Sequence, residues 1–406
     1  MFVNLAYLLD KPTGTASYAL NLLPYLEALS PTYFAASLID SLSELSPNEA
    51  EFAKPLSAQK DSRIVIVPAN MTAKAGAVGH LRRLGWTQFQ LPKLIKKLDC
   101  SSAQKSLNRP VHSNSGQPLL FTPIPEAPLS LFNRLSFGHS RLRSVVTFHD
   151  LIPLRFPKDF GAIRFYVRYY VPQVLAQAEK VICNSEATAR DAADFYQIPA
   201  RKLVPIPLAY DANHFRPTRD RPDVLATAGL SGRPYFLTLG RQAPYKNIGR
   251  VIESLSQVPA CDLVIAGPHD PRYTPALEQL AEEKGVRSRV KFISYVPYAQ
   301  LPALLSHAIA LVFPSLWEGF GLPVLEAMAC ATPVITSNIA SLPEVAGDAA
   351  YLINPYSLSE MVCAMRAIAS DTSARQQLSQ AGLQRAKAFS WQKTGAQTRQ
   401  VLEPLI

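Results

Sequence analysis

One stretch of the sequence, residues 313–355, constrains the fold more than any other. An apolar run that ends at Phe313 has the length of a buried strand, and a glycine-containing loop, Pro314–Leu322, follows it. Pro323–Cys330 then has a helical pattern with proline in the first turn, where a missing N–H costs nothing. Because another apolar strand begins at Val334, the stretch predicts a βαβ unit. Its loop lies at the edge where open α/β sheets bind ligands.

The start of that predicted helix can receive a ligand. The backbone N–H groups of Phe320, Gly321 and Leu322 have no partner inside the helix, so they can donate to an anion or a hydroxyl. Two carboxylates bracket them, with Glu318 in the loop and Glu326 about one turn into the helix. Two glutamates eight positions apart usually face solvent, so the pair alone predicts little.

The surrounding sequence makes the pattern specific. The segment EGFGLPVLEAMACATPVI is followed, after five residues, by SLPEVAGDAA. Together they resemble the signature of retaining GT-B glycosyltransferases, most closely family 4, the large sucrose-synthase and mannosyltransferase-like group. The resemblance is strong over 235–355, good over 144–153 and weak over 40–140. It implies an α/β protein of two Rossmann-like domains facing across a cleft.

Length and composition agree with two α/β domains. A chain of 406 residues is too long for one ordinary core, and its hydrophobic content of 48% alternates between strand-like and helix-like segments. The net charge of +10 fits an anionic ligand, a membrane surface or nucleic acid. No basic-aromatic stacking platform is recognisable, so no nucleic-acid partner is predicted.

The cysteines and the hydropathy pattern predict a location. The five cysteines are scattered, with no metal-ligand spacing, which is typical of core thiols in a reducing cytoplasm. No signal peptide precedes the first strand, and no stretch of about 18 uninterrupted apolar residues is present. We therefore expect a cytoplasmic protein, soluble or peripheral to the inner face of the membrane.

Two loops of the N-terminal half are candidates for the site. The first follows a predicted strand at Phe2–Leu9, and it lacks the second and third glycines of a dinucleotide fingerprint, so NAD is not expected. In the resembled family this loop approaches the sugar and the donor phosphates, where Gly14 would allow close approach of the backbone; a plain tight turn is the alternative. The second, VTFHDLIPL, places His149 at the end of an apolar strand. It resembles the family's loop beside the donor sugar, whereas Asp150 has the position of a residue that braces a turn.

Basic residues of this half have two interpretations. The segment His80–Leu98 is basic and amphipathic and could lie on an anionic membrane, but an ordinary surface helix interrupted by Pro92 is favoured. Four further cations could form a rim for an anionic acceptor, although a solvated helix face is favoured: Arg155, Lys158, Arg164 and Arg168.

The C-terminal half begins after a charged, proline-containing linker at His214–Arg233. A strand at Tyr235–Leu239 then leads into GRQAPYKN ahead of a helix. Arg241 offers a planar fork and Lys246 a point charge, as a diphosphate requires, and G-R-x4-K-N matches the family's donor-phosphate motif. By the same resemblance, Val296 and its neighbour Tyr295 line the nucleobase pocket.

The resemblance also implies an activity and a division of the chain. The domains are residues 1–215 on the acceptor side, 216–388 for the nucleotide sugar, and 389–406 as a helix that crosses back. A hexose would pass, with retention of configuration, from a nucleotide-diphospho-sugar to a glycan, a lipid-linked or a small-molecule acceptor. Glu326 would bind the ribose, and Glu318 the sugar hydroxyls.

Metal and cofactor requirements follow from the same residues. No Asp-x-Asp metal motif is present, and two protein cations can replace a metal, so we expect metal independence and no cofactor beyond the co-substrate. A phosphorylase-like enzyme or an epimerase is disfavoured, because the pyridoxal-lysine context is missing and the glutamate pair is present. A catalytically silent GT-B subunit that acts as a binding partner remains the alternative, against which the retained charges argue.

Overall fold

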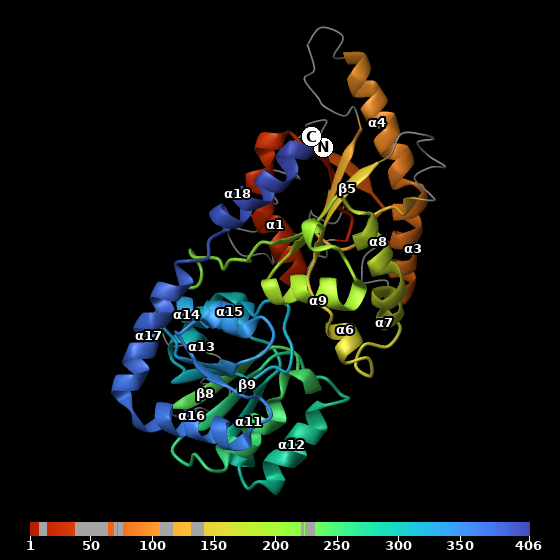
Figure 1. Ribbon diagram of the computed structural model, residues 1–406. Helices are drawn as coiled ribbons and strands as arrows, with labels where there is room; N and C mark the ends of the chain where they lie inside the picture. The colour runs from red at the N-terminus through yellow and green to blue at the C-terminus, as the bar shows by residue number, and fades with distance from the viewer. Residues whose placement is uncertain are drawn as a thin grey trace.

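The computed structural model describes residues 1–7, 14–36, 64–68, 71, 76–105, 117–130, 142–220, 223 and 232–406. These residues form two parallel sheets, each flanked by helices, in the two halves of the chain (Figure 1). Most strand positions are apolar and buried, as expected for strands covered on both faces.

The first sheet has seven strands in the order β3-β2-β1-β4-β5-β6-β7. The strands are β1 (Phe2–Leu5), β2 (Thr32–Ala36), β3 (Ile64–Val67), β4 (Leu119–Thr122), β5 (Arg143–Phe148), β6 (Lys180–Cys183) and β7 (Leu203–Pro205). The helices are α1 (Gly14–Leu26), η1 (Glu27–Leu29), α3 (Gly76–Phe89), α4 (Leu91–Lys105), α6 (Ile152–Arg155), α7 (Ile163–Phe165), η6 (Tyr166–Tyr170), α8 (Val171–Gln177), α9 (Glu186–Tyr196) and η7 (Ala200–Lys202). The strand order reverses direction between β1 and β4, which is where such sheets bind ligands.

The second sheet has six strands in the order β10-β9-β8-β11-β12-β13. The strands are β8 (Tyr235–Leu239), β9 (Asp262–Ala266), β10 (Val290–Ile293), β11 (Ala310–Phe313), β12 (Val334–Ser337) and β13 (Tyr351–Ile353). The helices are η8 (Pro244–Lys246), α11 (Ile248–Leu255), α12 (Thr274–Glu283), η9 (Arg287–Arg289), η10 (Tyr298–Gln300), α13 (Leu301–Ser306), α14 (Leu322–Ala329), α15 (Leu342–Ala346), α16 (Leu358–Ser370), α17 (Thr372–Ala386), α18 (Trp391–Leu402) and η11 (Glu403–Leu405). Here the reversal lies between β8 and β11.

The end of the chain returns to the first domain. Helix α18 packs beside α1 in Figure 1, and the two chain ends lie close together. Gly395 makes this packing close, because a Cβ atom there would lie 2.3 Å from Cγ of Tyr25. Thr394 also donates to the carbonyl of Pro207 at 2.8 Å. The last helix therefore belongs by contact to the N-terminal domain, although it follows the second sheet in sequence.

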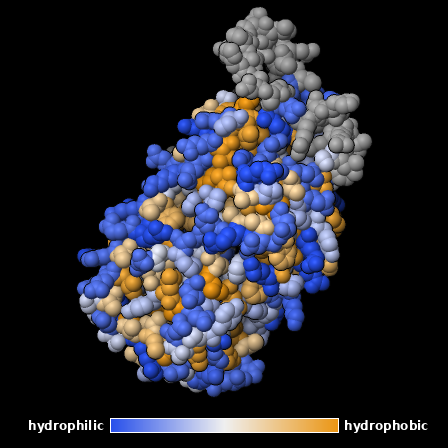
Figure 2. Space-filling model, viewed as in Figure 1, coloured by the Kyte–Doolittle hydropathy of each residue, from blue (hydrophilic) through white to orange (hydrophobic). Residues whose placement is uncertain are grey.

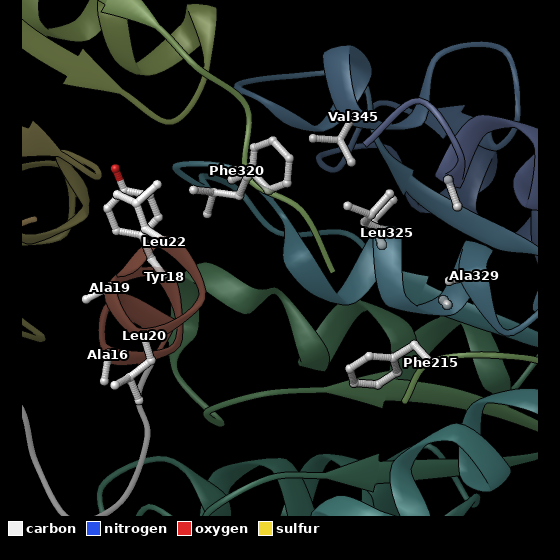
Figure 3. Packing of buried hydrophobic residues seen from close by; sticks show 14 of the residues in the cluster. Ala16, Tyr18, Ala19, Leu20, Leu22, Phe215, Phe320, Leu325, Ala329 and Val345 are labelled. Atoms are coloured by element: carbon white, nitrogen blue, oxygen red, sulfur yellow. The ribbon is translucent and has the colours of Figure 1, made fainter. Parts of the chain in front are cut away.

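A single apolar cluster continues from one domain into the other. Figure 3 shows Tyr18 and Leu22 of α1 on one side of Phe320, and Leu325 of α14 on the other. Phe320 also contacts Phe389 edge to face, with ring centroids 5.9 Å apart. Burial of these aromatic and aliphatic side chains holds the two domains together.

Some predicted elements differ from those observed. The segment His80–Leu98 is two helices, α3 and α4, with Pro92 in the first turn of the second, where it is tolerated. Residues 163–177 form one helical run, in which the π-helical turn η6 lies between α7 and α8. The end of the first predicted strand, most of the loop after it and residues 224–231 of the predicted linker lie outside the described residues.

No helix within the described part of the chain is long and apolar enough to cross a bilayer.

Candidate active site

The carboxyl ends of β8 and β11 bring three predicted charges into one region. Arg241 and Lys246 follow β8, and Glu318 follows β11, its neighbour in the sheet. Nζ of Lys246 lies 2.6 Å from Oε1 of Glu318, and both side chains are almost fully buried. An ion pair so far removed from water persists only when its geometry is good, so the two charges hold each other in place.

Aromatic rings complete the surroundings of Lys246. Its ammonium group lies 4.7 Å from the ring centre of Phe313 and 5.4 Å from that of Tyr245. Ring faces attract a cation, so they favour the charged amine without competing for its hydrogen bonds. By contrast, Arg241 is exposed, and its guanidinium group donates no hydrogen bond to any described residue. Its guanidinium group is therefore free to accept an anionic ligand.

A serine side chain fixes the loop that carries Glu318 through hydrogen bonds. The hydroxyl group of Ser341 contacts the carbonyl oxygens of Glu318 and Phe320 at 3.0 and 2.8 Å. Gly321 has a φ of 106°, which favours glycine, and it caps α14. The amides of Phe320, Gly321 and Leu322 donate to no described residue. As predicted, they lie unpaired at the helix start.

His149 follows β5 and is oriented by the neighbouring strand. Its Nε2 lies 2.8 Å from the carbonyl oxygen of Pro123, just after β4. A carbonyl only accepts, so Nε2 carries the proton and Nδ1 presents its lone pair when the ring is neutral. Burial lowers the pKa of His149, although the bond to Pro123 acts in the opposite direction. Tyr18 meets the imidazole edge to face, 5.3 Å away.

The two candidate loops touch each other across the domains at Gly319. A Cβ atom on this glycine would lie 2.0 Å from the carbonyl oxygen of His149. The Gly319 carbonyl accepts hydrogen bonds from the hydroxyl groups of Ser185, at 2.6 Å, and Thr188, at 3.0 Å. Both hydroxyls lie at the start of α9. The contact brings the His149 loop against the loop that carries Glu318.

Sequence reasoning missed a second cross-domain contact. The carboxylate of Glu344 accepts from the backbone N–H groups of Glu186 and Ala187, both at 2.9 Å, and so caps α9 from the other domain. Asp191 accepts from Trp317 at 3.1 Å and from Arg155 at 2.6 Å. The only features of the sequence that pointed to these contacts were a serine at the start of a predicted helix and a tryptophan next to the predicted glutamate.

Arg155 is exposed, as a solvated helix residue is, but it also has partners that this interpretation did not include. Its guanidinium carbon stacks 3.4 Å from the ring centre of Trp317, which belongs to the other domain. The guanidinium group meets its acidic partner and the aromatic ring face only in the folded protein. Arg164, which is less exposed than Arg155, donates to the carbonyl of Pro157 at 3.4 Å.

The other predicted residues lie in less defined surroundings. Gly14 is the first residue of α1, and a Cβ atom there would meet nothing within 4 Å, so its closeness to a donor stays a prediction. Val296 packs against the core cluster, whereas Tyr295 is exposed. Asp150 accepts from the N–H of Ile152 at 2.9 Å, as a turn-bracing residue does. Burial raises the pKa of Asp150 to about 6.

Comparison with known proteins identifies the family. The model described as Glycosyl transferases group 1 matches residues 225–385, and the model described as Glycosyltransferase Family 4 matches residues 122–214. O-antigen chain mannosyltransferase B of Escherichia coli is 32% identical over 270 residues, which cover 64% of this chain and 70% of that protein. This chain belongs to glycosyltransferase family 4.

Further relatives and solved structures agree with this family-4 membership. O-antigen chain mannosyltransferase RfbU of Salmonella typhimurium is 29% identical over 68% of this chain and 74% of its own. The matching part covers only 32% of the serotype-specific mannosyltransferase WbdA of Escherichia coli. Among solved structures, Anabaena HepE, crystallised with UDP and glucose, has a TM-score of 0.69 at 18% identity and 99% coverage of both chains. The glycosyltransferase WaaG gives 0.64 at 14%, again with 99% of both chains covered. The predicted fold class, GT-B with two Rossmann-like domains, is confirmed.

Metal ligands are not grouped in the described residues of this glycosyltransferase. No cluster of three or more His, Cys, Asp or Glu side chains is placed to hold an ion there.

The carboxyl group of Glu326 in this family-4 enzyme should be visible in the pH dependence of its stability. Burial raises the pKa of Glu326 from its ordinary value of 4.5 to about 7. The folded state then binds the proton more tightly than the unfolded chain, so its stabilising effect is full below about pH 4.5 and is lost as the pH rises through 7. We expect Glu326→Gln to match the parent Tm near pH 5 and to exceed it at pH 8. The exposed Glu282→Gln serves as control, and a pH-independent difference would contradict this expectation.

Proposed function

We propose that this chain is a metal-independent, retaining hexosyltransferase that uses a nucleotide-diphospho-sugar and acts on a glycan or lipid-linked acceptor. The observation that carries the proposal is the buried Lys246–Glu318 pair, 2.6 Å apart at the switch point of the second sheet, against the loop of His149. A cation and a carboxylate suit, respectively, a diphosphate and the hydroxyl groups of a sugar.

The reaction assigns a part to each predicted residue. The bond between the anomeric carbon and the β-phosphate oxygen breaks, its electron pair stays on that oxygen, and a new bond forms to the acceptor oxygen. The acceptor's hydroxyl proton leaves with the nucleoside diphosphate. Arg241 and Lys246 would neutralise the charge that grows on the leaving diphosphate, which is the largest change of charge in the step. The diphosphate would therefore lie beside Lys246, next to the carboxylate of Glu318.

The remaining groups would hold the donor. Glu318 and the unpaired amides of Phe320, Gly321 and Leu322 suit hydroxyl groups of the sugar, and Glu326 suits those of the ribose. His149, neutral and fixed by Pro123, would contact the sugar from the other domain. Gly14 and Val296 keep their proposed places near the donor phosphates and the nucleobase.

Mannose is the first sugar to test. Two relatives that this chain resembles over most of their length are named O-antigen chain mannosyltransferases. The same names make a glycan acceptor the natural choice. Retention of configuration is a general property of the family, and we extend it to this member.

Contact with the membrane is a separate part of the proposal. Helices α3 and α4 carry four exposed cations: Arg82, Lys93, Lys96 and Lys97. Such a surface is attracted to anionic lipid by about 1 kcal/mol per cation near the surface. The four described cysteines are free thiols, which suits the cytoplasmic side.

A panel of donors tests the proposal. The protein is incubated with GDP-, UDP-, ADP- and dTDP-hexoses, with and without EDTA, and release of nucleoside diphosphate is measured. We expect slow hydrolysis of one donor, insensitive to EDTA and lost in Glu326→Ala. Loss of activity in EDTA would disprove metal independence alone. Absence of both turnover and thermal stabilisation by every donor would instead favour a silent subunit.

A further inference from the structure

Helix α9 of the N-terminal domain lies at the boundary with the second domain (Figure 1), where Figure 2 shows many hydrophilic residues. Three polar residues, Ser185, Thr188 and Asp191, follow each other at intervals of three, from the helix cap into the second turn. Residues three positions apart lie on the same face of an α-helix. All three side chains make hydrogen bonds to the loop that follows β11 in the other domain. One face of α9 therefore holds this loop.

The contacts of this helix face lie on both sides of Glu318. The indole Nε1–H of Trp317, the preceding residue, donates to Oδ2 of Asp191 at 3.1 Å. The carbonyl oxygen of Gly319, the following residue, accepts from the two hydroxyl groups at the start of α9, at 2.6 and 3.0 Å. Glu318 belongs to the second domain, but both of its neighbours in the sequence are fixed by the first.

Arg155 completes the contacts of Trp317. Its Nη2 donates to Oδ1 of Asp191 at 2.6 Å, and its guanidinium carbon lies 3.4 Å from the centre of the indole ring. Each oxygen of the Asp191 carboxylate thus accepts from one donor, and a hydrogen bond to an ionised acceptor is stronger than one between neutral groups. The side chain of Asp191 is only 8% exposed, so water competes little for these donors. The indole ring is therefore held both at its nitrogen and over its face.

The position of Trp317 matters because the next residue carries the proposed sugar-binding carboxylate. Glu318 must also keep its oxygen 2.6 Å from Nζ of Lys246, which leaves little room for a shift of the loop. A displacement of about 1 Å at a reacting group can cost about 10²-fold in rate. By contrast, the hydrogen bonds that α9 makes to the described part of the second domain include none to Arg241 or Glu326. The groups proposed to bind the nucleotide are thus independent of this helix.

We propose that Asp191 is a positioning residue of the transferase, which acts through Trp317 to set the Glu318 carboxylate against the donor sugar. The inference rests on the proposed function, because that function assigns the sugar hydroxyl groups to Glu318. It adds a division of labour: the second domain binds the nucleotide by itself, whereas the sugar is placed correctly only when α9 of the first domain holds the loop.

Asp191→Leu tests this assignment, since leucine has the branched shape of aspartate but accepts no hydrogen bond. We expect kcat for donor hydrolysis to fall about 10²-fold, because the loop is no longer fixed. The Kd of GDP or UDP, whichever binds the parent protein in calorimetry, should stay unchanged, because neither compound carries the sugar. A merely structural role would weaken nucleotide binding together with kcat, and that result would overturn the proposal.

Asp194→Leu is the matched control for this variant. Asp194 is an acidic residue of the same helix, but it is exposed, and its side chain makes no hydrogen bond or ion pair within the described residues. We expect Asp194→Leu to keep the parent kcat. If Asp191→Leu and Asp194→Leu have the same kcat as the active parent, the positioning role is wrong.

Trp317→Phe shows whether Asp191 acts through the indole. This variant keeps an aromatic face for Arg155 and removes the N–H donor, so its kcat should also fall about 10²-fold. The double variant with Asp191→Leu should lose no more than either single variant, because both changes remove the same hydrogen bond. Independent effects would instead multiply to a loss of about 10⁴-fold, and that loss would contradict the proposed route.

Fluorine NMR reports the same contact without any turnover. The chain has three tryptophans, Trp86, Trp317 and Trp391, and 5-fluorotryptophan labels all of them. The signal that is missing from Trp317→Phe belongs to Trp317, and we expect it to shift in Asp191→Leu and to stay in place in Asp194→Leu. An unmoved Trp317 signal in Asp191→Leu would refute the contact.

The two proposals can be told apart by the activity of the parent protein. A parent that neither binds nor hydrolyses any donor of the panel means that the proposed function is wrong, and the role of Asp191 falls with it. An active parent whose Asp191→Leu variant keeps the full kcat refutes the positioning role alone.

Discussion

Lys246→Ala is expected to lower kcat/KM for the donor by about 10²–10³-fold, the effect typical of removing one group that stabilises the charge of a transition state. The ammonium group is held between Glu318 and the rings of Phe313 and Tyr245. Steady-state release of nucleoside diphosphate measures the loss. Lys284→Ala, which removes a more exposed lysine of the same domain, serves as the control.

The same substitution should also destabilise the protein. Removal of Lys246 leaves the Glu318 carboxylate buried without its cation, which typically costs about 3–5 kcal/mol. Adding Glu318→Gln removes the orphaned charge, so the double variant should regain much of its Tm and none of its activity. If both the single and the double variants keep the parent activity, the proposed role of Lys246 in neutralising the leaving diphosphate is wrong.

Gly319→Ala is expected to damage both activity and stability severely. The new Cβ atom would lie 2.0 Å from the backbone carbonyl of His149, far inside van der Waals contact, and no flexible side chain can give way. The loops must separate by more than an ångström, and a displacement of that size between catalytic groups can cost about 10²-fold in rate. The carbonyl of Gly319 would also leave Ser185 and Thr188, whose hydroxyls lose an acceptor.

Kinetics and thermal unfolding of Gly319→Ala check this result together. We expect kcat to fall by about 10²-fold and Tm to fall with it, since the domains lose a close contact. Gly85→Ala is the matched control, because a Cβ atom there meets nothing within 4 Å and alanine favours the helix by about 1 kcal/mol. An unchanged kcat in Gly319→Ala would show that the contact with His149 has no part in catalysis.

The sequence by itself determined the elements and the order of the loops. Buried strands such as Asp262–Ala266 and Tyr235–Leu239 are mostly apolar, and Ser185 and Ser390 are the N-caps of helices in the structure. These features depend on neighbours within a few positions, which the sequence displays directly. In a parallel sheet such strands also fix which loops lie at the ligand edge, so Arg241, Lys246, Glu318 and His149 could be named without coordinates.

Only the tertiary structure decided which of these residues meet and what their charges do. The pairing of Lys246 with Glu318, the contact of Gly319 with His149 and the capping of α9 by Glu344 join positions that are 72, 170 and 158 residues apart. The same holds for Arg155, whose sequence context is that of a surface helix but whose partners lie in both domains. Packing depends on distances across the folded chain, and burial then sets the pKa of groups such as Glu326. The local sequence pattern predicts neither the packing nor the pKa shifts, because the low dielectric that shifts the pKa of a group exists only in the folded core.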